Sequence, residues 1–281
     1  MGGSCIWVSQ LFFNNQLNTK KIMETENILG QSMTFTAPSG YQYTIREQNG
    51  NDDDVISNPA DAANLMNFSK FIAGIVIDTN YTTNRKLTLE QAHNMPALDR
   101  YAILINSRIF SIGEELEFTW DWGKDKGGVI TYVQNLNEFL FEYSELPTPE
   151  DIEAKPYAIP YYPNGGKFTD IEINLTSGKL VKFDLITAKG ESFIINLPVE
   201  ARTKNKELEA RNLQLQVNGK WEKVSSFHVF TVKDMREIRS AVNEADPLFD
   251  GTMVINNPKY PELTSTVSIM ALKGFFYPEE M

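Results

Sequence analysis

Residues 97–123, ALDRYAILINSRIFSIGEELEFTWDWG, decide the fold of this chain. Apolar side chains recur at helical spacing over residues 98–112, and the glycine that follows is typical of a helix C-terminus. Residues 114–122 then alternate between apolar and polar, which predicts a strand. The strand ends in an aromatic corner, defined here as Trp120 and Trp122. The stretch therefore predicts a helix with a short exposed polar face, followed by a strand. We interpret it as a structural element rather than a reaction centre.

Upstream of this stretch, the pattern predicts a hairpin and two helices. Residues 33–46 alternate on either side of Pro38-Ser39-Gly40, a turn sequence. Residues 47–54 are rich in carboxylates and glycine, which predicts a loop, and apolar residues at helical spacing predict a helix within 55–78. Thr88 is expected to cap a further short helix, because a glutamine stands three residues later, as in a capping box.

Downstream, Gly127-Gly128 turns the chain into a second strand, expected over 129–136, and residues 137–143 fit a strand or a short helix. A similar order returns after residue 166. The second half is expected to contain a hairpin over 171–185 around Ser177-Gly178, helices over 206–217 and 231–242, a strand from Gly251 to Ile255 and a last strand within 264–277. The parallel predicts two copies of one module.

Domain organisation follows from the distribution of proline. Residues 147–166 contain five prolines, which disfavour a helix or a central strand and predict a domain linker. The predicted fold class is α+β, with two related small modules, each a β-hairpin or sheet with two or three helices. The expected divisions are an N-terminal extension of uncertain status over 1–22, a first module over 23–146, the proline-rich linker over 147–166, and a second module with a C-terminal strand over 167–281.

Composition limits the partners. The chain has 26 basic and 37 acidic residues and a net charge of −11, which repels nucleic acid and anionic membrane surfaces. Cys5 is the single cysteine, so no internal disulfide is expected, and His93 and His228 complete no zinc framework or nucleophile motif. The sequence contains no run of about 18 apolar residues, so it predicts no membrane span. We therefore expect protein partners or neutral ligands, and no metal or cofactor.

Two acidic groups suggest chemistry, each beside a structural interpretation. Asp52-Asp53-Asp54 offers oxygen atoms of the kind that bind calcium, but it lacks EF-hand spacing, so a solvated acidic turn is favoured. Glu114, Glu115 and Glu117 lie beside tryptophans, as carboxylates do in glycosidases. On a strand, Glu115 and Glu117 share one face, which is typical of an exposed edge protected by charge.

Aromatic residues give the strongest indication of a binding surface. Trp120 and Trp122 share one face of the predicted strand. Aromatic side chains are enriched at the hot spots of protein interfaces, although the same two residues suit an equally favoured role in covering the module core. The expected protein-binding set is Trp120, Trp122, Tyr157, Tyr161, Tyr162 and Trp221.

Short motifs in both halves are shared with a known family. They are the Ser-Gly hairpin, the strand ending in Ile45-Arg46-Glu47, the helix with Asp99-Arg100 and Ser107-Arg108-Ile109, then Ser111-Ile112-Gly113, the aromatic corner, LTSGKLVKFDL, Asn205-Lys206-Glu207-Leu208, Arg211, and Asp234-Met235-Arg236. Over most of residues 33–258 the chain thus resembles the tailed-phage baseplate hub assembly chaperones of the T4 type and related tail-assembly proteins. In several members of that family the corner is a Cys-x-x-Cys or Cys-x-Cys knuckle. Here Trp120, Asp121 and Trp122 replace it, which removes the implied metal.

The resemblance implies a non-enzymatic protein that helps to build a phage tail or baseplate, or remains in the virion. Its partners would be other tail or baseplate proteins, in an oligomeric particle or in the host cytoplasm during assembly. The residues themselves leave two other classes open. A carbohydrate- or peptide-binding module would use the aromatic corner, and a carboxylate-based hydrolase would use Glu115 or Glu117.

Overall fold

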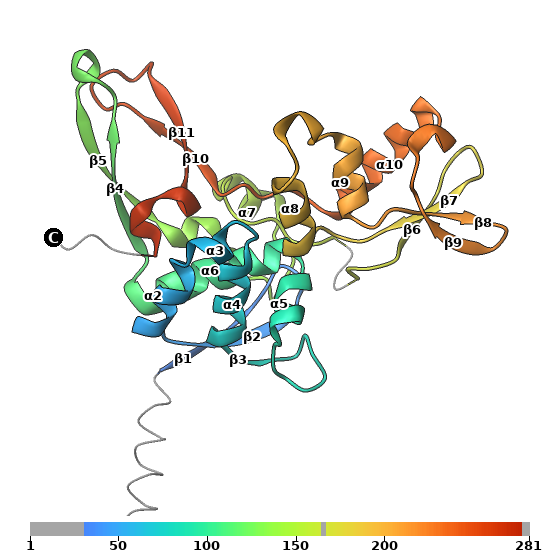
Figure 1. Cartoon of the computed structure of the whole chain (residues 1–281). Coiled ribbons are helices and arrows are strands. Elements are labelled where there is room, and N and C mark those ends of the chain that lie inside the picture. Colours follow the sequence, from blue (N-terminus) through green and yellow to red (C-terminus); the bar gives the residue numbers. More distant parts are fainter. Residues whose placement is uncertain (1–30, 164–166, 277–281) are drawn as a thin grey trace, which may run out of the picture.

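The computed structural model describes residues 31–163 and 167–276 (Figure 1). The predicted extension over 1–22 lies outside these residues. Helices and strands are interspersed along the described chain, and the strands form four small sheets there. This confirms the α+β class. One hydrophobic cluster includes residues from both halves, from Ala37 to Phe276.

The first sheet is antiparallel, in the order β1–β2–β3. β1 and β2 form the predicted hairpin around Gly40, whose φ of 82° suits a residue without a Cβ. Tyr43 and Ile45 on the central strand are fully buried and anchor the sheet to the core. The strands are β1 (Ser32–Thr36), β2 (Gln42–Arg46) and β3 (Val76–Thr79).

Four short helices belong to the first half, and two of them depart from expectation. Thr88 caps the last one as predicted. The predicted loop over 47–54 is wrong, because Asn49 and Asp52 form a capping box that starts a helix. The single helix predicted within 55–78 is broken at Leu65, which has a left-handed φ of 57°, and its end continues as β3. The helices are α2 (Gly50–Ile56), α3 (Pro59–Ala62), α4 (Met66–Ile75) and α5 (Leu89–Asn94).

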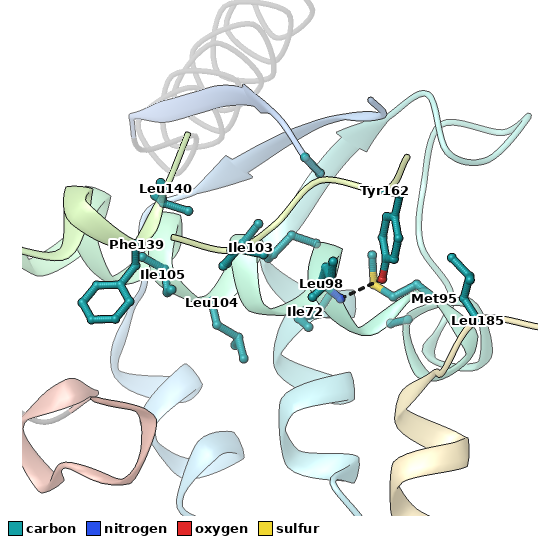
Figure 2. Close-up of a cluster of buried hydrophobic side chains, with 14 of the residues drawn as sticks. Ile72, Met95, Leu98, Ile103, Leu104, Ile105, Phe139, Leu140, Tyr162 and Leu185 are labelled. Carbon is teal, nitrogen blue, oxygen red and sulfur yellow. Dashed lines mark hydrogen bonds between the residues drawn. The ribbon is translucent and has the colours of Figure 1, made fainter. Parts of the chain in front are cut away.

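The predicted central helix is α6 (Ala97–Ile112), which ends at Gly113 with a φ of 122°. Eleven of its sixteen residues are buried. The expectation of an exposed polar face is wrong, since Asp99 and Arg108 are buried with the apolar residues. Segments from both halves cover the helix. Figure 2 shows its side chains among those of Ile72, Tyr162 and Leu185.

A two-stranded antiparallel ribbon follows α6, as predicted: β4 (Glu115–Asp121) pairs with β5 (Val129–Asn135). The connection contains the 3-10 helix η1 (Lys124–Lys126), and η2 (Leu136–Phe139) follows β5. Exposed and buried residues alternate along β4, so one face of the ribbon packs inward and the other faces solvent. The ribbon projects from the body of the molecule (Figure 1).

The proline-rich segment contains a helix, so the expectation that its prolines prevent one is wrong. Thr148 caps α7 (Pro149–Ala154), and Pro149 occupies the first turn. Proline is tolerated there because a backbone N–H in the first turn has no partner within the helix.

The rest of this segment packs against the first half of the chain. Ile159 is fully buried, and its backbone N–H donates to the carbonyl of Phe139 at 2.9 Å. The backbone N–H of Tyr162 donates to the carbonyl of Pro38 at 3.2 Å. The segment is therefore a packed strap rather than a free linker.

The second half holds a four-stranded antiparallel sheet, in the order β6–β7–β8–β9. The hairpin predicted around Gly178 is confirmed. The helix predicted over 206–217 is wrong in its second part, because Asn212 adopts a left-handed φ of 53° and a strand follows. The elements are β6 (Ile171–Asn174), β7 (Leu180–Phe183), α8 (Ala188–Ile195), η3 (Val199–Ala201), α9 (Lys204–Ala210), β8 (Gln214–Val217) and β9 (Lys220–Lys223).

The second long helix is confirmed as α10 (Val232–Ala245), which follows η4 (Phe227–Val229) and is capped by Thr231. A second ribbon then forms from β10 (Thr252–Asn256) and β11 (Thr264–Ser268). The last predicted strand is shorter than expected.

Two 3-10 helices, η5 (Ile269–Ala271) and η6 (Lys273–Phe275), replace its end and lead the chain back to the first half. There the ring of Phe276 lies 5.7 Å from that of Phe68 and 6.2 Å from that of Phe71, between ring centroids.

The two halves share an order of elements. Each begins with a hairpin whose second strand pairs with a later strand, and each continues with a long helix and a two-stranded ribbon. The hairpin turns match as well. The Ala37 N–H donates to the Tyr41 carbonyl at 2.8 Å, and the Leu175 N–H donates to the Lys179 carbonyl at 2.9 Å. That the repeat arose by duplication stays a prediction.

Candidate protein-binding surface

The aromatic corner joins the two ribbons. Trp120 and Trp122 are half-buried and pack against the core. The indole N–H of Trp122 donates to the hydroxyl of Tyr132 on β5 at 2.9 Å, and that hydroxyl donates to the carbonyl of Asn256 on β10 at 3.0 Å. The corner therefore serves the contact between β4–β5 and β10–β11, which together are called the arm below.

The tip of the arm is held by polar contacts between its two ribbons. The side-chain amide of Asn257 donates to the carbonyl of Lys126 at 2.7 Å, and Lys259 Nζ donates to the carbonyl of Gly127 at 3.3 Å. Gly127 has a φ of 102°, and a Cβ there would lie 3.1 Å from the Lys259 side chain. The tip therefore requires glycine at this position.

The three predicted tyrosines belong to the strap. Tyr157 is half-buried, and its hydroxyl accepts a hydrogen bond from the Val254 N–H at 3.4 Å. Tyr161 is half-buried against the core. Tyr162 is buried, and its hydroxyl accepts the N–H of Leu98 at 3.0 Å (Figure 2). Tyr162 therefore completes the start of α6 and is no part of an exposed docking surface.

Trp221 lies on β9, in the part of the molecule farthest from the arm (Figure 1). The ammonium group of Lys182 lies 4.7 Å from the centre of its indole ring, a cation–π contact within the second sheet. The six predicted residues thus do not form one surface, because the chain distributes them over the arm, the strap and the second sheet.

The exposed side of the β4–β5 ribbon is the surface that the arm offers instead. We call it the outer face: Glu115, Glu117, Thr119 and Asp121 on β4, and Val129, Thr131 and Val133 on β5, all exposed. Val129 keeps 65% and Val133 59% of its surface accessible, which is high for branched apolar residues. A row of carboxylates thus lies beside a row of β-branched side chains. The predicted exposure of Glu115 and Glu117 is confirmed.

A contact between a serine and a histidine was not evident from the sequence. Ser69 Oγ lies 2.9 Å from His93 Nδ1. The serine is fully buried and donates to the carbonyl of Leu65 at 3.1 Å. Burial, followed by the positive charge of Arg100, lowers the pKa of His93. Because a nucleophile has to reach its substrate, this buried hydroxyl is structural. His228 is exposed in η4 and lies apart from the pair.

The acidic group lies at the start of α2 rather than in a turn, and Asp53 and Asp54 are exposed as expected, whereas Asp52 is buried. The Asp52 carboxylate accepts both terminal nitrogens of Arg46, at 2.7 and 2.8 Å, and the N–H of Asn49 at 2.8 Å. No group of three or more His, Cys, Asp or Glu side chains within 31–163 and 167–276 is arranged to hold a metal. Over the same residues, no helix combines the length and apolar character needed to span a membrane.

A cavity of about 820 Å³ lies between the two halves, lined by residues of α5, α8 and α9 and by Phe168. One of its carboxylates is already engaged: Asp184 accepts the N–H of Asp170 at 2.9 Å and the amide of Asn212 at 3.0 Å. The Asp184 carboxylate in the cavity wall is therefore already engaged within the chain, whereas the side chains of the outer face are exposed. Comparison with known protein families, characterised proteins and solved structures finds no match to this chain.

Proposed function

We propose that this chain is a non-enzymatic bacteriophage tail or baseplate protein, which acts in assembly or in the particle through protein–protein contacts. The observation that supports the proposal is the outer face of the arm. The ribbon packs aromatic residues on its inner side and presents an exposed outer face whose composition suits a protein partner. The phage setting itself rests on the sequence motifs.

The outer face also indicates the chemistry of its partner. Glu115, Glu117 and Asp121 lie in one row on the same face of β4, with Thr119 between the last two. A partner with lysine or arginine side chains beside an apolar strip would satisfy this row and cover Val129 and Val133 at the same time. Because the whole chain carries a charge of −11, long-range attraction favours basic surfaces as well.

Charge reversal on the outer face tests the proposal. Glu117→Lys combined with Asp121→Lys is expected to abolish recovery of tails when the variant complements a phage that lacks this gene, and to abolish co-purification of tail proteins. Glu222→Lys on β9 is the matched control, since it is also exposed on a strand but lies far from the arm. Equal assembly by the outer-face variant and the control would contradict the proposal.

The carbohydrate-binding alternative has weaker support. Sugar-binding platforms present open aromatic faces, whereas Trp120 and Trp122 pack against the core and Trp122 is hydrogen-bonded within the arm. The hydrolase alternative needs two carboxyl groups that face each other across the scissile bond. Glu115 and Glu117 instead lie side by side on one strand and face solvent.

A further inference from the structure

The outer edge of β5 carries unpaired backbone groups. In the β4–β5 register, the N–H of Trp122 donates to the carbonyl of Gly128 at one end, and the N–H of Leu136 donates to that of Glu114 at the other, at 3.0 and 2.8 Å. Hydrogen-bonded pairs alternate with non-bonded pairs in an antiparallel ribbon. The backbone N–H and C=O groups of Val129, Thr131 and Val133 therefore point away from β4.

Two other strands of the arm, β4 and β10, have outer edges that are partly covered. Gly274 of η6 lies against the outer edge of β4, so that a Cβ there would be 3.3 Å from the Glu117 carbonyl. The edge of β10 is covered by Tyr157, which bonds the Val254 N–H, and by Tyr132. Within the described chain, no hydrogen bond from another segment reaches the outward groups of Thr131. In Figure 1, β5 lies on the outside of the arm, away from β10 and β11.

The sequence of β5 does nothing to block pairing. β5 reads VITYVQN, with no charged residue and no proline over seven positions. Exposed edge strands are normally short or carry lysine, proline or inward charges, because a long uncharged edge recruits another strand. The edge strands of the second sheet follow that rule, since β6 reads IEIN and β9 reads KWEK, each over four positions.

We propose that β5 pairs with β5 of a second copy of this chain, antiparallel, with a two-fold axis at Thr131. In this register Thr131 lies opposite Thr131 of the second copy, and Val129 lies opposite Val133 in both directions. The three outward-facing pairs exchange about six backbone hydrogen bonds. The two arms become one four-stranded sheet, in the order β4–β5–β5–β4.

Charges at the two ends of the ribbon are complementary between two antiparallel copies, which favours a second copy as the occupant of the edge. The antiparallel register places the tip of each ribbon, with Lys124 and Lys126 exposed, beside the base of the other ribbon, where Glu138 is exposed. The two acidic rows on β4 are separated by three strand spacings, about 14 Å. That exceeds the screening length of about 8 Å at physiological ionic strength, so the carboxylates do not oppose pairing.

This pairing does not depend on the proposed function. It concerns purified protein alone, whereas the proposed function concerns contacts with other proteins through the β4 carboxylates. A failure of either experiment therefore leaves the other result interpretable.

Sedimentation equilibrium over a range of concentrations tests the pairing. The full chain is expected to shift from 31.9 kDa toward twice that mass as concentration rises. Thr131→Lys places two like charges opposite each other at the axis and is expected to weaken the dimer about tenfold or more. Thr119→Lys is the control, because Thr119 lies opposite Thr131 within the same ribbon but away from the free edge.

A charge-swap experiment separates loss of pairing from loss of folding. Thr131→Lys and Thr131→Glu are each expected to be monomeric when alone and to form a mixed dimer when combined, which damage to the fold would not produce. A wild-type mass that stays at 31.9 kDa at every concentration, or a dimer that Thr131→Lys leaves intact, would overturn the proposal. A third outcome would also overturn it: a wild type that is monomeric but binds tail proteins, with that binding lost in Thr131→Lys. The edge of β5 would then serve a different protein and not a second copy.

A cysteine placed at the axis gives a second, geometric test. Thr131→Cys in a Cys5→Ser background is expected to form a disulfide-linked dimer on mild oxidation, because paired residues of this type lie about 5.5 Å apart between Cα atoms, within disulfide range. Thr119→Cys in the same background is expected to stay monomeric. Equal cross-linking of the two variants would contradict the register.

Discussion

Asp99 in the first turn of α6 accepts two hydrogen bonds from Ser39, 60 residues earlier in the sequence: one from its backbone N–H at 3.0 Å and one from its hydroxyl at 2.5 Å. The hydroxyl of Tyr43 donates to the same carboxylate at 3.0 Å. The contact fastens the β1–β2 hairpin to the N-terminal end of the central helix. In the second half, the carboxylate of Asp234 in the first turn of α10 likewise accepts a hydrogen bond from Lys179 Nζ of the matching hairpin, at 2.6 Å.

The pH dependence of stability tests the burial of Asp99. Burial raises its pKa from 3.8 to about 6, against the lowering effect of the hydrogen bonds from Ser39 and Tyr43. Between these two pH values the unfolded chain has released the proton while the folded chain retains it. Protonation therefore stabilises the fold fully below pH 3.8, and this contribution is lost as the pH rises through about 6.

Asp99→Asn removes this titration. The free energy of unfolding of the wild type, measured relative to Asp99→Asn by urea denaturation, is expected to fall by about 2 kcal/mol from pH 4 to pH 7. Groups common to both proteins cancel in the difference. A difference that stays constant or rises over this range would show that Asp99 is ionised in the fold at low pH.

Removal of the Tyr162 hydroxyl tests the strap. Pro96 precedes α6 and provides no side-chain cap, so the hydroxyl of Tyr162 is the acceptor for the Leu98 N–H. Tyr162→Phe leaves that buried N–H without a partner and is expected to lower the free energy of unfolding by about 1–3 kcal/mol. Tyr161→Phe, at a half-buried neighbouring position, is the control and should change stability by less than half as much.

A buried ion pair between α9 and α10 gives a third prediction. Arg211, which follows α9, donates through Nε to Oδ2 of Asp246, which follows α10, at 3.1 Å. Its Nη2 atom lies 2.9 Å from the same oxygen, and both side chains are buried. Arg211→Met leaves the Asp246 carboxylate buried, with the Ile186 N–H as its remaining hydrogen-bond donor. The variant is expected to lower the free energy of unfolding, measured by thermal or urea denaturation, by about 3–5 kcal/mol. Adding Asp246→Asn should recover part of this loss. Equal stability of the single and double variants would argue against pairing.

The joint between the two ribbons gives a fourth prediction. Tyr132→Phe removes both hydrogen bonds of its hydroxyl, to Trp122 and to Asn256, and is expected to lower the free energy of unfolding by about 1–2 kcal/mol. Hydrogen exchange should accelerate at the tip of the arm, around Lys126. If exchange rises throughout the chain instead, the joint supports the whole fold rather than the arm alone.

Local sequence patterns predicted the elements whose residues carry their own signal. The hairpin at Gly40, the cap at Thr88 and the helix end at Gly113 are set by residues that favour one backbone conformation, so they were predictable. The break at Leu65 was not, because leucine gives no local signal for the left-handed backbone that it adopts there. The local signal for α7 is the Thr148 capping box, which starts a helix despite the prolines around it.

The candidate surface was only partly predictable. Alternation along β4 predicted the exposed carboxylates, but the same alternation cannot say whether the opposite face, with Trp120, meets solvent or another ribbon. That ribbon comes from β10 and β11, more than 100 residues later. The free edge of β5 was equally hidden, since pairing between distant segments determines which edge remains open.

The return of the chain to its beginning has a consequence for synthesis on the ribosome. Phe275 and Phe276 are buried with aromatic residues of α4, so the first half lacks part of its interior until residue 276 has emerged. A nascent chain that stops after α10 would expose Phe68 and Phe71. Such a fragment presents the apolar surface that chaperones and proteases recognise, so only chains translated past the second ribbon acquire the finished fold.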